Sequence, residues 1–347
     1  MNIEMKKIFD KWQEYTLAND RGMSIHVLDF GGIITKIFVP DKLGNRENIV
    51  LSYRDYHDYE MNPHYLGAII GRVAGRIQNA SFELENKTYQ LTSNNGKNHL
   101  HGGPDGFHRV LWKTTPFQTK DTVGVKFTHK SLDGEGGYPG NVEIVVTYTL
   151  TNDNEFILDY EASSDQTTPL TLTNHSYFNL SGDLKRSIEE HRVMIFSSKF
   201  VELDMDLIST GKLIDVEGTP FDFRNGGLTL KTGFHSSFEQ NVKVGNGYDH
   251  YFLFDEQEDV KALLEDSISG RIMTVKTNQP GMVMYTSNSM DKGWNLRECL
   301  SQKYLGVCFE TQGSPASLHQ QGFPSIILKA GERYAKQTVF SFRLKDD

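Results

Sequence analysis

Hydrophobic positions along most of this chain recur at every second residue. Two such runs, residues 143–150 and 156–161, flank the turn Asn152-Asp153-Asn154. A period of two is typical of strands with one buried face, and a short polar turn between two such runs predicts a β-hairpin. Further strands are expected at Ser24–Leu28, Ile33–Val39, Val123–Thr128, Arg192–Phe196, Arg271–Thr277, Val283–Thr286, Gly306–Phe309 and Gln337–Arg343.

Helical periodicity is scarce in this chain. Residues Met5–Tyr15 are expected to form one short helix, with Ile8 and Trp12 on one face. Many short strands without alternating helices favour an all-β antiparallel sandwich or barrel over a parallel α/β fold. No linker-like tract or repeat divides the chain, so we expect one large β domain over residues 15–347 after an N-terminal extension, residues 1–14. Two packed β domains without a visible boundary are the alternative.

Charge and cysteine content exclude several classes of protein. The 347 residues include 36 Lys and Arg against 45 Asp and Glu, a net charge of −9. Nucleic-acid binders and proteins of anionic membrane surfaces normally present a basic field, so neither partner is expected. Cys299 and Cys308 are too few for a disulfide scaffold and are expected to be free thiols. No apolar run resembles a signal sequence or a membrane span, so we expect a soluble cytoplasmic protein.

The sequence lacks the familiar cofactor and nucleophile motifs. It contains no phosphate-binding G-x-x-x-x-G-K-S/T loop, no G-x-G-x-x-G, no G-x-S-x-G elbow and no H-E-x-x-H. Candidate residues sit instead in glycine-rich or strand-end segments. His99 and His101, two apart on an extended strand, would face the same side and suit a metal, but no third ligand is near in sequence. Hydrogen bonding fits equally well, and this segment alone favours turn residues with satisfied hydrogen bonds.

Four further polar residues or pairs invite both a functional and a structural interpretation. His175 has the hydrogen-bonding neighbours of a positioned acid or base, or it ends a strand at a capped turn. Arg72 and Arg76 could clamp a ligand or form surface ion pairs. Asp249 lies in a Gly-Tyr-Asp-His-Tyr segment, and Glu310 ends an apolar strand, where a partly buried carboxylate needs a partner or a function. Aromatic side chains that could stack on a neutral sugar are available at Tyr177, Trp112 and Tyr285.

Ordered motifs of this kind run through nearly the whole chain. They are Asp29-Phe30-Gly31-Gly32, Tyr65-Leu66-Gly67-Ala68, Gly71–Ile77, Asn98–Gly103, Asn174–Leu180, Gly218–Arg224, Tyr248-Asp249-His250, Tyr285–Asn288, Glu310-Thr311-Gln312 and Phe323-Pro324-Ser325. Together they closely resemble the aldose 1-epimerase (galactose mutarotase) family over roughly residues 15–343. The resemblance implies an all-β fold, a large antiparallel β-sandwich of the galactose mutarotase type.

The resemblance also implies a reaction, the interconversion of the α and β anomers of free aldohexoses such as galactose and glucose. By the family pattern, Glu310 is the general base on the C1 hydroxyl and His175 the general acid on the ring oxygen. The sugar would be bound by Arg76, His101 and Asp249, with Tyr177, Gly75 and Tyr285 beside them. A carboxylate with a pKa of about 4.3 and a histidine with one of about 6.5 suit these roles near neutral pH. No metal or cofactor is expected.

The chain departs from the family pattern at three places. Gly75 stands where members commonly have Asn, Val283 where many have Gln, and His319 ends a segment that usually reads P-D-A-x-N. These departures leave the preferred sugar open, while the proposed acid and base are present. Two alternative functions are a non-catalytic sugar-binding β-sandwich and an epimerase of a phosphorylated or different aldose. The expected partner is a small sugar, and the expected assembly is a monomer or a homodimer.

Overall fold

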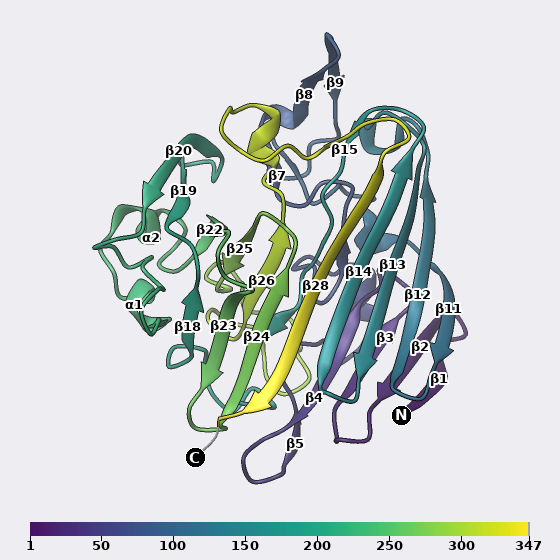
Figure 1. The fold of residues 1–347 in the computed structure, drawn as a ribbon, viewed down its shortest axis with the longest axis vertical. Helices are drawn as coiled ribbons and strands as arrows, with labels where there is room; N and C mark the ends of the chain where they lie inside the picture. The colour runs from purple at the N-terminus through teal and green to yellow at the C-terminus, as the bar shows by residue number, and fades with distance from the viewer. Residues whose placement is uncertain (346–347) are drawn as a thin grey trace.

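Three antiparallel sheets form the framework of the protein, as this computed structural model shows for residues 1–345 (Figure 1). The first sheet contains, in spatial order, β1 (Asn2–Ile8), β2 (Trp12–Ala18), β3 (Ser24–Leu28), β4 (Ile34–Pro40) and β5 (Arg46–Asn48). The second contains β11 (Lys113–Gln118), β12 (Thr122–Ser131), β13 (Val142–Thr151), β14 (Glu155–Ser164), β28 (Arg333–Leu344), β24 (Arg271–Thr277), β23 (Val260–Asp266), β18 (Arg192–Ile195) and β21 (Leu228–Thr229). The third contains β17 (Tyr177–Phe178), β26 (Val307–Gln312), β25 (Gly281–Tyr285), β22 (Asp249–Leu253), β19 (Lys199–Leu203) and β20 (Ser209–Asp215).

Short ladders and helical turns connect the three sheets. The two-stranded ladders pair β6 (Ile69–Ile70) with β16 (Thr173–Asn174), β7 (Arg76–Ile77) with β10 (His99–Leu100), β8 (Ser81–Leu84) with β9 (Lys87–Gln90), and β15 (Thr168–Pro169) with β27 (Ile327–Leu328). The helices are α1 (Lys231–Phe234), α2 (Glu239–Lys243) and the 3-10 turns η1 (Tyr56–Glu60), η2 (Gln78–Ala80), η3 (Phe107–Arg109), η4 (Glu135–Gly137) and η5 (Pro315–Leu318). Among the described residues, no helix is long and apolar enough to cross a membrane.

The core lies between the sheets because each presents one apolar face inward. Along β13, buried and more exposed residues alternate strictly, as the period-two pattern predicts. Leu17 and Ile25 of the first sheet belong to the same buried cluster as Val125 and Val146 of the second. Figure 1 shows the purple strands of the first sheet behind the teal strands β11–β14. The prediction of a large antiparallel β-sandwich is confirmed.

The strands expected from the sequence all form, but the expected N-terminal helix is wrong. Residues 2–8 and 12–18 are the antiparallel strands β1 and β2, joined by a tight turn in which Phe9 and Asp10 have positive φ angles. Ile8 and Trp12 lie directly opposite each other across this turn. A spacing of four therefore places two apolar residues together in a tight hairpin as it would on a helix. Trp12 also stacks on Phe30, with 4.6 Å between ring centroids.

Candidate active site

A cavity of about 260 Å³ opens beside the third sheet, and residues from the β7–β10 ladder and η5 also line it. All eight candidate residues border it, although they lie up to 235 positions apart: Gly75, Arg76, His101, His175, Tyr177, Asp249, Tyr285 and Glu310. Trp112 does not. It is buried in the main core, where its indole N–H donates to the Phe107 carbonyl at 3.3 Å. Stacking of Trp112 on a ligand in this cavity is therefore excluded.

The third sheet places two carboxylates and two tyrosines on the cavity side. Asp249 of β22 lies directly opposite Tyr285 of β25, and Cys308 of β26 lies opposite both Tyr285 and Tyr177. Directly opposed residues in antiparallel strands point to the same face. Glu310, two residues beyond Cys308, shares that face because side chains alternate along a strand. The period-two pattern thus directs these side chains into one site.

The two histidines reach the cavity from connecting segments. His101 follows β10 with a left-handed backbone, φ 53°, and its Nδ1 accepts a hydrogen bond from the Gly75 N–H at 3.1 Å. Burial, followed by the neighbouring His175, lowers its pKa well below the ordinary value, so the ring is neutral near pH 7. A neutral ring that accepts at Nδ1 carries its proton on Nε2. His101 is therefore a hydrogen-bond donor at its other ring nitrogen.

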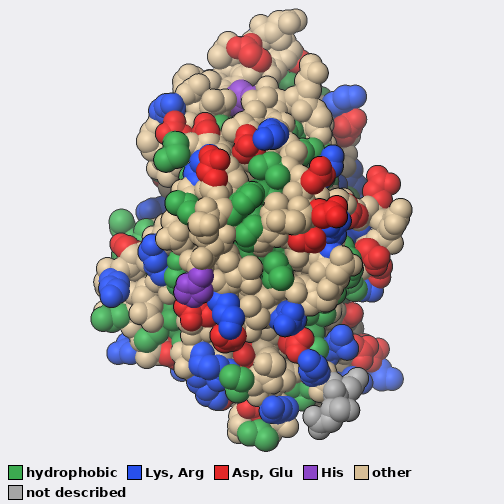
Figure 2. Space-filling model, turned by 90° about the vertical axis from the view of Figure 1, so that its left-hand side faces the viewer, with side chains coloured by type: hydrophobic (Ala, Val, Ile, Leu, Met, Phe, Trp, Pro, Cys, Tyr) green, Lys and Arg blue, Asp and Glu red, His purple; other side chains and the backbone are tan. Residues whose placement is uncertain are grey.

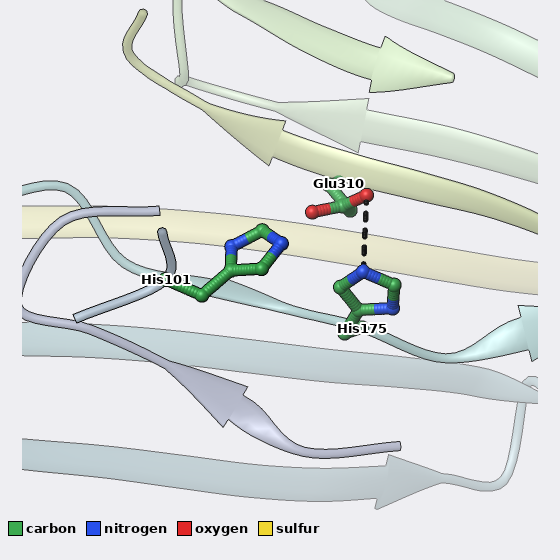
Figure 3. A group of neighbouring side chains, drawn as sticks. All are labelled: His101, His175 and Glu310. Carbon is green, nitrogen blue, oxygen red and sulfur yellow. Dashed lines mark ion pairs between the residues drawn. The ribbon is translucent and has the colours of Figure 1, made fainter. Parts of the chain in front are cut away.

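His175 and Glu310 form the closest acid–base pair in the cavity. The His175 Nε2 lies 3.5 Å from Glu310 Oε1, and both side chains are buried (Figure 3). Burial lowers the pKa of His175 to about 3. Burial and then the Asp249 charge raise the pKa of Glu310 well above its usual value, against the opposing effect of Arg76. Both shifts favour the uncharged forms, a neutral imidazole beside a protonated carboxyl group, so the pair holds one transferable proton.

Arg76 and Asp249 form a second, half-buried pair beside the first. The Arg76 Nη1 lies 3.5 Å from Asp249 Oδ2, and Arg76 Nε donates to Asn95 Oδ1 at 3.2 Å. Burial raises the pKa of Asp249, while the Arg76 charge lowers it. Both groups line the cavity and keep donors or acceptors for a ligand. A polar, uncharged molecule with many hydroxyl groups fits this combination of donors and acceptors.

The same histidines and carboxylate must be considered as metal ligands. One ligand atom each from His101, His175 and Glu310 lie within 4.8 Å of one another. Figure 3 shows the two imidazole rings and the carboxylate converging. However, the hydrogen bond from Gly75 occupies the lone pair of the neutral His101 ring at Nδ1. Its Nε2 then presents a proton, which suits a sugar hydroxyl oxygen and opposes a metal ion.

Two other candidate residues have structural roles. His99 contacts the Thr92 carbonyl at 2.7 Å through Nδ1 and the Tyr138 hydroxyl at 2.8 Å through Nε2. The expectation that His99 and His101 face the same side is wrong, because the left-handed backbone at His101 ends the strand. Arg72 is buried, and its guanidinium donates to Ser131 Oγ and to the carbonyl groups of residues 132 and 139. Each is satisfied without a ligand.

Several cavity residues were missed by the sequence interpretation. The clearest is Gln312, whose Nε2 donates to the Ala74 and Gly313 carbonyls while its buried Oε1 has no partner within residues 1–345. Its position two residues after Glu310 was the available signal, since both side chains face the cavity. Tyr65 packs edge-on against His101, with 4.8 Å between ring centroids. All three departures from the family pattern also border the cavity: Gly75, Val283 and His319.

The fold and this cavity define a class, the β-sandwich enzymes of the galactose mutarotase-like fold. The model of the aldose 1-epimerase family matches residues 13–341. Galactose mutarotase of Mus musculus is 39% identical over 335 residues, covering 95% of this chain and 94% of that one. Maltose epimerase of Levilactobacillus brevis is 33% identical over 320 residues, covering 92% and 91%. The crystal structure of galactose 1-epimerase from Lactobacillus acidophilus NCFM superposes with a TM-score of 0.88 at 29% identity, covering 99% of both chains. The chain belongs to the aldose 1-epimerase family.

Proposed function

We propose that this protein is an aldose 1-epimerase that interconverts the α and β anomers of free aldohexoses such as galactose and glucose. The observation that carries the proposal is the buried contact of 3.5 Å between Glu310 Oε1 and His175 Nε2 in a cavity rich in hydrogen-bonding groups. A carboxylate and an imidazole in contact can take up one proton and deliver another in a single catalytic cycle.

The reaction needs one proton removed and one delivered. Glu310 takes the proton of the O1 hydroxyl while His175 Nε2 gives a proton to the ring oxygen, so that the C1–O5 bond breaks and a C1 carbonyl forms. Rotation about the C1–C2 bond presents the other carbonyl face, and the two proton transfers then reverse. Glu310 ionised with His175 protonated has the same proton count as a protonated carboxyl group beside a neutral imidazole. A hydroxyl that donates to Glu310 shifts the proton toward His175.

The remaining polar residues hold the sugar. The Nε2–H of His101 donates to a sugar oxygen, and the guanidinium of Arg76 and the carboxylate of Asp249 bind hydroxyl groups. Tyr177 and Tyr285 are fixed by their own hydroxyls, which contact the His64 carbonyl at 3.0 Å and Ser289 Oγ at 2.6 Å. Rigid groups of this kind keep the sugar oriented while its ring opens.

The charges of the cavity disfavour a phosphorylated sugar. Arg76 is the one Lys or Arg among the described residues that line the cavity, and Asp249 and Glu310 oppose it. A non-catalytic binding protein is disfavoured for another reason. Burying His175 and Glu310 together is costly in free energy, and hydrogen bonding to a sugar alone does not require a pair of exchangeable acid and base groups.

Polarimetry tests the proposal directly. Freshly dissolved α-D-glucose and α-D-galactose are followed in weakly buffered solution with wild-type protein, Glu310→Gln and His175→Asn. Wild type is expected to accelerate the approach to the same final rotation. Each variant is expected to lose about a hundredfold or more of that rate, as for loss of a general acid or base. The ratio of the rates for the two sugars ranks them.

Matched controls separate catalysis from folding. Glu217→Gln and His235→Asn make the same chemical changes at exposed positions. Both controls are expected to retain wild-type rates, and circular dichroism checks that all four variants fold. An active Glu310→Gln/His175→Asn double variant would refute the assignment of these residues. Sugar binding by calorimetry without any acceleration would instead support a binding protein.

A further inference from the structure

The buried thiol of Cys308 lies beside the proposed acid, His175, and has no part in the mechanism given above. Cys308 is fully buried, and its Sγ lies 3.6 Å from His175 Nδ1. The opposite ring nitrogen, Nε2, is the atom that faces Glu310. Cys308 itself is not among the residues that line the cavity. It therefore contacts the imidazole at the nitrogen opposite the one that faces Glu310, without bordering the cavity.

We propose that Cys308 is a positioning residue, whose thiol holds the His175 ring by Nδ1 and thereby directs Nε2 toward Glu310 and the sugar. This inference rests on the proposed epimerase function. It gives Cys308 a role in the site, although Cys308 is buried and lies far from His175 along the chain. Because Cys308 does not touch the sugar, its effect on catalysis must pass through the imidazole.

A thiol suits a histidine whose protonation changes during the reaction. The S–H group rotates, so sulfur can accept a hydrogen bond from a protonated Nδ1 or donate one to an unprotonated Nδ1. Burial, followed by the Glu310 charge, raises the pKa of Cys308 well above its usual value, so the group stays a neutral thiol. A carboxylate in the same place would instead stabilise the imidazolium strongly and oppose release of its proton to the ring oxygen.

The strand geometry leaves the thiol little freedom to move. Cys308 lies on β26, between β17 and β25, with Tyr177 and Tyr285 directly opposite it on these two neighbouring strands. The His175 ring lies against both tyrosines, with 5.1 Å and 6.5 Å between ring centroids. These three neighbours restrict the ring, and Cys308 is the one among them whose polar atom contacts Nδ1. The proposal therefore requires a polar end on the side chain at residue 308.

Two substitutions distinguish hydrogen bonding from packing. Cys308→Ser keeps a rotating donor and acceptor but is smaller, whereas Cys308→Val fills the space without a hydrogen bond. The proposal predicts that Val lowers kcat about tenfold, with KM changed much less, and that Ser retains more activity than Val. Simple packing predicts the reverse order, because valine leaves no cavity. Cys299→Ser, at the other free cysteine, is expected to match wild type.

Nitrogen-15 NMR of the histidine side chains gives a readout that does not depend on activity. The His175 ring signals, assigned with His175→Asn, are expected to shift in Cys308→Val and to stay near wild type in Cys308→Ser. Unchanged His175 signals in the folded Val variant, or a kcat for Val equal to or above that for Ser, would overturn the proposal. An inactive wild type would refute the epimerase function separately, while the NMR comparison would still test the contact.

Discussion

The side-chain amide of Gln312 is already oriented to accept a hydrogen bond from a ligand. Its Nε2 is held by two backbone carbonyls, which fixes the orientation of the amide and leaves Oε1 without a donor among residues 1–345. A buried acceptor without a partner costs free energy. A sugar hydroxyl that donates to Oε1 would remove that cost. Gln312 is therefore expected to contribute to affinity more than to the proton transfers.

Gln312→Met tests this expectation at the scale of one residue. The variant removes the acceptor while keeping a side chain of similar length. Loss of one hydrogen bond to the sugar is expected to raise KM about fivefold, with a smaller change in kcat. Initial rates from polarimetry over a range of galactose concentrations measure both constants, and thermal unfolding checks the fold. An unchanged KM in a stable variant would show that the sugar does not use this oxygen.

The segment between β10 and η3 determines where His101 points. Gly102, with φ +84°, brings its Cα so close to the segment after β6 that an added Cβ would lie 1.7 Å from the Gly71 carbonyl oxygen. His101 immediately before it also has a left-handed backbone. The tight backbone turn at His101 and Gly102 directs the His101 ring toward Gly75. This segment positions the His101 ring through its backbone conformation, so Gly102 matters for the site as much as His101 does.

Gly102→Ala, compared with Gly44→Ala, tests that role. Gly44 has nearly the same φ, +85°, but an added Cβ would meet nothing within 4 Å. Gly44→Ala is expected to cost about 1 kcal/mol of stability from backbone strain alone. Gly102→Ala is expected to cost about 2 kcal/mol more and to lower kcat/KM, because the backbone must shift under His101. Urea unfolding and polarimetry measure these effects. Equal stability of the two variants would contradict the close approach.

Across the whole molecule, buried neutral histidines link stability to pH. Burial lowers the pKa of His191 and His108 to about 4 and that of His250 to about 3. On the face in Figure 2, acidic and basic side chains are interspersed, so mutual repulsion of one charge type does not dominate there. The unfolded chain, with histidine pKa values of about 6.5, binds more protons below that pH. The contribution of these histidines to stability is therefore fully present above about pH 6.5 and falls as the pH is lowered toward 4.

His191→Gln tests this linkage away from the cavity. His191 Nε2 accepts a hydrogen bond from the Leu180 N–H at 2.9 Å, and the glutamine oxygen can accept the same bond. Removing one titrating group is expected to reduce the slope of unfolding free energy against pH by about 1.1 kcal/mol per pH unit between pH 6 and 5. Urea unfolding at several pH values measures the slope. A slope as steep as that of wild type would show that His191 is already protonated in the folded protein.

The sequence alone determined the strands, the class of fold and the family, because these depend on local alternation and on motifs that lie within a few residues of each other. Strands such as Ser24–Leu28 and Arg271–Thr277 form with the expected bounds. The predicted N-terminal helix was wrong because the spacing of Ile8 and Trp12 fits either a helix or a tight hairpin. Only the pairing of β2 with β3 decides between the two.

The tertiary structure decided which candidate side chains meet. His99 and His101 separate because one residue adopts a positive φ, and Trp112 turns into the core. The contacts of His175 with Glu310 and Cys308 join positions more than 130 residues apart, so neither spacing nor composition contains them. Burial that shifts the pKa values of this pair arises from the packing of several strands. These properties depend on long-range packing, and only the folded chain fixes it.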